Sequence, residues 1–215
     1  MNLLPRSRNP RREISEMLPS IEPPAHALPP RLGSAAARDF ARESLAALGQ
    51  AARAHSAADA AALAVLKMEP EEAASKFANL CADGPAGGEA VGPCADLYEA
   101  ARSADTAGHK VDAALLLAVL AGTAKGRRDG LLGLAVLAIR EGLVNEAWNM
   151  ISAQLESGDR HPRALSIAGI CELERGDAAT AQSYLAAASR MARREPAYRA
   201  ELQMAQRALL LMHLG

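Results

Sequence analysis

The chain has 215 residues, which is enough for one or two domains with a substantial hydrophobic core. Half of its residues are apolar, but only 3% are aromatic. Its 24 basic and 25 acidic residues give a net charge of −1, so the chain lacks the overall basic character of a nucleic-acid-binding protein, and no nucleic-acid partner is expected.

Alanine is the commonest residue, and leucine, arginine, glutamate and glutamine are also frequent. All five are favourable helix formers. Valine and isoleucine are scattered, and they do not alternate with polar residues over the length of a strand. The composition therefore predicts an all-α fold, in which small side chains let neighbouring helices approach closely.

Residues 1–33 contain prolines at high density. Proline removes a backbone donor and disfavours the helical conformation in the residue before it, so this segment is predicted to be a disordered tail rich in Pro and Arg. Two other interpretations are open. One is a short helix around residues 13–18, and the other is a linear docking motif with apolar anchors at Leu18, Ile21 and Leu28.

The start of the chain lacks the apolar stretch of a secretory signal, and no run of residues reaches transmembrane length. Three cysteines, an odd number, argue against a disulfide framework and fit a reducing compartment. We therefore expect a cytoplasmic protein that does not insert into a membrane.

Three helices are predicted between residues 34 and 82, and we interpret them as an N-terminal cap or a divergent helical subdomain. The first begins at Ser34, which can cap it, and ends near Arg53. Its inner face carries Phe40, Leu45 and Leu48.

Local signals also mark the second and third helices. Ser56 and Asp59 have the spacing of a capping box and predict a helix that ends near Lys67. The third helix is expected to begin at Pro70, where proline suits the first turn and neighbouring acidic residues complement the helix dipole. It is expected to end near Cys81.

Residues 83–93 are rich in Gly and Pro and are predicted to be a linker. Residues 94–215 then show an internal repeat. Identical residues recur at one fixed spacing at Gly108, Gly142 and Gly176, at Ala113, Ala147 and Ala181, and at Pro162 and Pro196. We divide the region into units at 94–127, 128–161 and 162–195, followed by a C-terminal capping helix. The solvent-exposed face of that helix is expected to carry Arg199, Glu201, Gln203 and Arg207.

A period of about 34 residues is the signature of the tetratricopeptide helix–turn–helix unit, and the C-terminal part of the chain resembles this family. The third unit carries the family's packing positions as Leu165, Ala168, Gly169, Gly176, Ala181, Leu185 and Ala188. The usual aromatic residues are replaced by Leu or Ala and the closing proline is displaced, so the units are tetratricopeptide-like. The resemblance implies an α-solenoid whose first helices line a concave face.

On this register a set of side chains points into the concave face. The predicted partner-binding residues are Tyr98, Arg102, Leu132, Val136, Ile139, Arg140, Arg163, Ile170 and Leu173. They form an apolar trough with a basic rim, which suits an amphipathic helix or an extended apolar peptide. The alternative is a trough filled by the protein itself, through its C-terminal helix, its N-terminal helices or a second copy in a homodimer.

No catalytic constellation is found in the sequence, and no cofactor or metal is expected. The five histidines are dispersed, and His109 and His161 fall at helix boundaries, where capping explains them. Cys81 and Cys94 flank the linker without a C-x-x-C unit, which makes them weak candidates for a zinc site or a disulfide. Cys171 is expected to be a buried small residue.

The leading hypothesis is a non-enzymatic adaptor or chaperone that holds an apolar or amphipathic segment of a partner protein. Its architecture is similar to that of tetratricopeptide chaperones and adaptors of bacterial secretion and pilus systems. The alternative is a structural subunit or homo-oligomer whose groove is permanently filled. A third and remote hypothesis is a thiol enzyme that uses Cys81 and Cys94.

Overall fold

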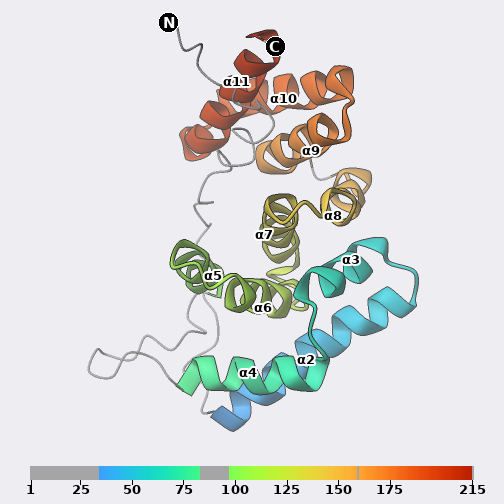
Figure 1. Cartoon of the computed structure of the whole chain (residues 1–215), viewed down its shortest axis with the longest axis vertical. Helices are drawn as coiled ribbons and strands as arrows, with labels where there is room; N and C mark the ends of the chain where they lie inside the picture. Colours follow the sequence, from blue (N-terminus) through green and yellow to red (C-terminus); the bar gives the residue numbers. More distant parts are fainter. Residues whose placement is uncertain (1–33, 83–96, 159, 215) are drawn as a thin grey trace, which may run out of the picture. The chain divides into compact units, whose positions relative to one another are not determined.

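The computed structural model describes residues 34–82, 97–158 and 160–214 (Figure 1). Within these residues all regular structure is helical, which confirms the predicted all-α class. The predicted tail (1–33), the predicted linker (83–93) and Cys94 lie outside the described residues. The elements are α2 (Ser34–Arg53), α3 (Ala57–Leu66), α4 (Pro70–Ala82), α5 (Leu97–Thr106), α6 (Lys110–Ala121), α7 (Arg127–Arg140), α8 (Val144–Glu156), α9 (Pro162–Arg175), α10 (Ala178–Ala192), the 3-10 helix η1 (Pro196–Tyr198) and α11 (Arg199–Leu214).

The three N-terminal helices begin and end within a few residues of the positions expected from their capping signals. Ser56 precedes α3, and its hydroxyl accepts a hydrogen bond from the Asp59 N–H at 3.4 Å. The carboxylate of Asp59 does not complete a capping box. It is buried and accepts two hydrogen bonds from Arg127, at 2.8 and 2.6 Å, so it joins the start of α3 to the start of α7. The helix predicted from the spacing of Ser56 and Asp59 is present, and Ser56 caps it.

Three of the described turns between consecutive helices have the same backbone geometry. Gly108, Gly142 and Gly176 all have positive φ, at 83°, 75° and 90°. At each turn the glycine N–H donates to the carbonyl three residues earlier, and the next N–H donates to the carbonyl five residues earlier. This is the pattern of a helix that ends in a left-handed glycine. The helices that follow begin at Lys110, Val144 and Ala178, which keeps the spacing of the glycines.

The helices joined by these turns bury equivalent positions. The buried sets, whose members are separated by the same spacing, are Leu97, Leu131 and Leu165; Ala101, Ala135 and Gly169; Ala113, Ala147 and Ala181; and Leu117, Ile151 and Leu185. Each set contains only small or aliphatic residues. Helix contacts at these positions therefore depend on small residues on one side and branched residues on the other.

The described helices fall into two compact units, divided between Gln154 and Leu155. In the first unit α2 packs on α3 and α4, and α6 packs on α2, α3 and α7. The approach is close enough to require glycine. A Cβ atom on Gly122 would lie 2.1 Å from the Ser44 carbonyl oxygen, and one on Gly130 would lie 2.4 Å from the Ala121 nitrogen. The three N-terminal helices thus share one core with α6 and α7.

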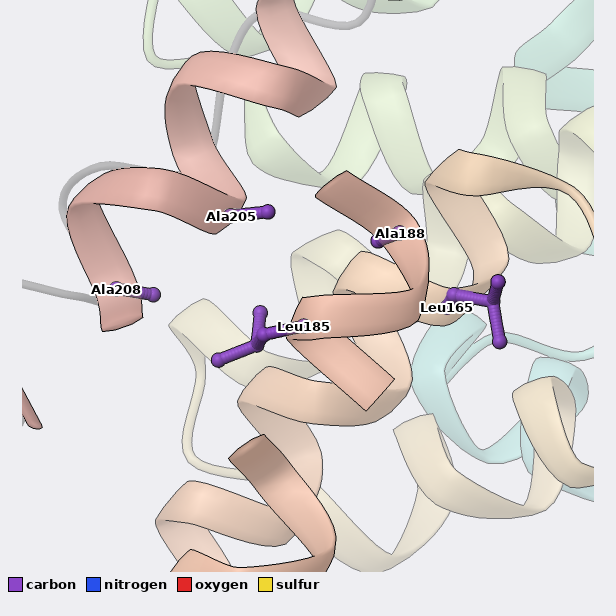
Figure 2. Close-up of a cluster of buried hydrophobic side chains, with 5 residues drawn as sticks. All are labelled: Leu165, Leu185, Ala188, Ala205 and Ala208. Carbon is purple, nitrogen blue, oxygen red and sulfur yellow. The ribbon is translucent and has the colours of Figure 1, made fainter. Parts of the chain in front are cut away.

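In the second unit, α10 packs between α9 and α11. Its core cluster contains Leu165 of α9, Leu185 and Ala188 of α10, and Ala205 and Ala208 of α11. Figure 2 shows the two α10 side chains between those of the two neighbouring helices. The alanines of α11 let this helix lie close to α10.

A buried ion pair also joins α9 to α11. The Nε of Arg163 lies 2.8 Å from Oε1 of Glu201, and the two residues are only 5% and 2% exposed. The expectation that Glu201 lies on the solvent-exposed face of the C-terminal helix is wrong, because its carboxylate neutralises a cation that α11 itself covers.

We expect Gly142→Ala to lower the free energy of unfolding by about 1 kcal/mol or more, because alanine is strained at positive φ. The space around a Cβ atom is open at Gly142, so backbone strain is the only cost. Gly49→Ala in α2 is the matched control. There a Cβ atom would touch only Arg53, at 3.6 Å, so the same substitution should stabilise the protein by up to about 1 kcal/mol. Urea denaturation followed by circular dichroism measures both, and equal effects would contradict the assigned geometry.

Glu201→Ala should lower the stability of the second unit by about 3 to 5 kcal/mol, because it leaves the Arg163 guanidinium buried without its carboxylate. Replacing both members by apolar residues, as in Arg163→Met with Glu201→Leu, should recover most of this loss. Glu195→Ala, at an exposed position before η1, is the control and should change stability by no more than about 0.5 kcal/mol. Urea denaturation measures the stability of each variant. An unfolding midpoint for Glu201→Ala equal to that of the unmodified chain would show that the ion pair does not stabilise the protein.

Candidate protein-docking site

The apolar residues of the predicted trough are covered. Leu132, Val136 and Ile139 of α7 are at most 5% exposed, and Ile170 of α9 is fully buried. Leu173, near the end of α9, is half-buried. A covered side chain contacts a partner only if the covering element moves away, so this stripe is not an open groove in the structure.

The predicted rim residues are engaged in ion pairs or buried. Arg102 binds Glu99 of the same helix, with its Nε 2.9 Å from the carboxylate. Arg140 forms an ion pair with Asp105. Tyr98 is buried, and Arg163 is the buried partner of Glu201, so the expectation that Arg163 lies on an exposed rim is wrong.

An open pocket lies in the first unit, next to Arg140. We call it the α3–α6–α7 pocket, and its volume is about 280 Å³. Its apolar wall consists of Val65, Leu66, Met68, Val111, Ala114 and Leu137, and its charged rim consists of Lys67, Asp105, Lys110, Arg140 and Glu141. Val111, at 52% exposed, is the most accessible large apolar residue of the wall.

Three helix ends bring these side chains together. Helix α3 ends at Lys67, whose positive φ of 54° turns the chain away and leaves the last apolar residues of the helix facing α6 and α7. The glycine turns at 108 and 142 place Lys110 at the start of α6 and Glu141 at the end of α7. The Nζ of Lys110 lies 2.5 Å from a Glu141 carboxylate oxygen. The pocket therefore sits where the end of α3 meets the start of α6 and the end of α7.

The cations of the rim stabilise the ionised form of Glu141. The hydrogen bond and charge of Lys110 hold the pKa of Glu141 below its ordinary value, and the charge of Lys67 acts in the same direction. Three cations and two carboxylates surround the apolar wall. Such a site can accept an apolar side chain while the rim binds polar or charged groups beside it.

Groups with catalytic potential are not gathered at this pocket. Burial raises the pKa of the Cys171 thiol to about 12, so its reactive thiolate form is suppressed. His161 accepts a hydrogen bond from the Arg163 N–H and so caps α9, which confirms the expected role, whereas His109 makes no such bond at the start of α6. Among the described residues, no group of three or more His, Cys, Asp or Glu side chains is placed to hold a metal ion.

Arg140 is the one pocket residue that the sequence predicted as a partner-binding residue. The other residues that line the pocket were not predicted. The predicted repeat register covers only residues 94–215, whereas Val65 and Leu66 come from α3 and Lys67 directly follows this helix. One signal was available in the sequence. Val111 is an apolar residue between the charged Lys110 and Asp112 in the first turn of α6.

We expect an NMR titration of the Glu141 carboxyl to give a pKa below the ordinary value for glutamate, and Lys110→Met to raise it. The reason is that the ammonium group stabilises the ionised carboxylate. Lys125→Met removes an exposed lysine that does not line the pocket, and should leave the titration of Glu141 unchanged. An unshifted Glu141 in the unmodified chain would contradict the ion pair.

Two further findings concern membrane-spanning helices and similarity to known proteins. None of the helices in the described part of the chain has the length and apolar character needed to cross a membrane. No protein-family model, no curated protein and no solved structure matches this chain.

Proposed function

We propose that this protein is a non-enzymatic adaptor or chaperone of tetratricopeptide-like, α-solenoid type, which binds a segment of a partner polypeptide. One observation carries the proposal. The evenly spaced turns at Gly108, Gly142 and Gly176 share the same φ sign and the same two hydrogen bonds. Repeated helix pairs of this length form extended binding surfaces in solenoid proteins.

The packing positions support the same proposal. A solenoid unit needs a small residue where its two helices cross and a bulky residue toward the next unit. The equivalent positions Ala113, Ala147 and Ala181 are fully buried, and so are the larger Ile151 and Leu185. Burial at equivalent positions supports a shared packing role in each proposed unit.

We place the docking contact at the α3–α6–α7 pocket rather than along the predicted trough. The trough residues Leu132, Val136 and Ile139 are covered, while Val111 is open to solvent beside the apolar wall. The partner segment would insert one apolar side chain and present charged or polar groups to Lys67, Lys110 and Glu141. Three or four such contacts, repeated along a segment, are the usual basis of peptide binding in a groove.

The alternative, a structural subunit whose trough is filled by its own helices, is favoured by one observation. Helix α3 packs against α7, the helix that carries most of the predicted apolar stripe. Light scattering after size exclusion tests the homo-oligomeric form of this alternative. A stable multiple of the monomer mass of 22.5 kDa supports a structural subunit, whereas a monomer contradicts the homo-oligomer.

Chemical crosslinking of the full-length chain tests the docking site. We expect an amine-reactive crosslinker to join a bound partner to Lys67 or Lys110 at the pocket rim, and not to the exposed Lys125, which does not line the pocket. Val111→Glu should remove the same partner, because it puts a charge beside the apolar wall. The loss should be at least about tenfold, the equivalent of 1.4 kcal/mol.

Ala47→Glu is the matched control, because Ala47 is exposed on α2 and does not line the pocket. It should leave the captured partner unchanged. Substitutions at Leu132 or Ile170 are unsuitable for this purpose, since a charge at a buried position would unfold the protein. Two results would show that the pocket is not the docking site. One is crosslinking through Lys125 as strong as through Lys67 or Lys110, and the other is capture of the partner by Val111→Glu as strong as by the unmodified chain.

A further inference from the structure

A second apolar groove lies in the unit that begins at Leu155. We call it the α10 groove. Its volume of about 570 Å³ falls within the range of about 300 to 1,000 Å³ that is typical of ligand-binding pockets. The apolar floor consists of Leu155, Leu165, Tyr184, Ala187 and Met191, and the rim consists of Glu156, Arg160, Ser183 and Arg190.

The groove exists because α10 is apolar on two faces. Leu185 and Ala188 point into the core between α9 and α11, as Figure 2 shows. Tyr184, Ala187 and Met191 lie on another face at the spacing i, i+3 and i+7, and Met191 is 37% exposed. A row of apolar residues at this spacing is the surface on which a short amphipathic helix docks.

The charges around the groove are mainly basic. Arg160 and Arg190 stand on its rim, together with the single carboxylate of Glu156. Two more exposed arginines, Arg193 and Arg194, follow directly after α10. An occupant that fits this surface should therefore combine apolar residues at helical spacing with acidic residues beside them.

One segment of the chain has this character. In residues 13–18, Ile14, Met17 and Leu18 stand at the spacing i, i+3 and i+4 of one helix face, and they are interleaved with Glu13 and Glu16. Pro19 ends any helix at this point. Arg11 and Arg12, directly before the segment, supply the opposite charge to the carboxylate of Glu156.

We propose that residues 13–18 of the same chain dock in the α10 groove, with Ile14, Met17 and Leu18 on its floor and Glu13 and Glu16 toward its arginines. Residues 19–33 connect this segment to α2 and span up to about 50 Å when extended. Covalent attachment gives the segment an effective concentration on the order of millimolar, so a weak contact is sufficient. The inference goes beyond the proposed function and does not depend on the α3–α6–α7 pocket.

Hydrogen exchange of the full chain, measured by mass spectrometry at short times, tests this proposal. We expect the amides of residues 13–18 to exchange at least about tenfold more slowly than in a variant that cannot dock. Arg190→Glu should remove the protection, because it places a carboxylate opposite Glu13 and Glu16. Leu18→Asp should remove it as well, through loss of an apolar anchor.

A charge-swap cycle separates a direct contact from a general effect on folding. Adding Glu16→Arg to Arg190→Glu should restore a large part of the protection, which a merely destabilised unit would not do. Gln182→Glu introduces the same negative charge on the exposed opposite side of α10 and should leave the protection unchanged. Circular dichroism of each variant verifies that the helices remain folded.

Three results would overturn the proposal. The first is free exchange of residues 13–18 in the unmodified chain, which would leave the groove to an external partner. The second is protection that rises with protein concentration, which would assign the segment to the groove of a second copy. The third is protection that survives both Arg190→Glu and Leu18→Asp.

Discussion

The structure depends on the close approach of helix backbones at alanine and glycine. Where α6 meets its neighbours, even one added methyl group on Gly122 or Gly130 would overlap with backbone atoms of another helix. The same constraint explains the scarcity of aromatic residues, because a ring at such a crossing would separate the helices by several ångströms. Much of the packing enthalpy therefore comes from many short contacts rather than from a few large side chains.

This constraint also shapes the surface. Helices that lie close together are covered on most sides, so an apolar face stays open only where no neighbour covers it. The end of α3 at Lys67 produces one such place, and the outer face of α10 produces another. In both places apolar residues are bordered by arginine or lysine, which keeps the surface soluble while leaving room for another polypeptide.

Local signals in the sequence predicted the helices well, because caps, prolines and glycines act within one turn. Pro70 marks the start of α4, and Gly176 marks the end of α9, as the residue types require. The openness of the trough could not be predicted in this way. Leu132 and Arg163 have the same local sequence signals whether solvent or another helix covers them, and their burial depends on contacts with distant parts of the chain. The assignment of the repeats to the tetratricopeptide family remains a prediction.

The buried pair of Arg163 and Glu201 has a consequence for the order in which this unit assembles. Helix α9 makes its main contacts with α10, whereas the carboxylate that neutralises Arg163 belongs to α11. While α11 is undocked the guanidinium must stay in water, so an α9–α10 pair alone cannot bury that part of its surface. Closure of this part of α9 is therefore coupled to the docking of α11 with Glu201.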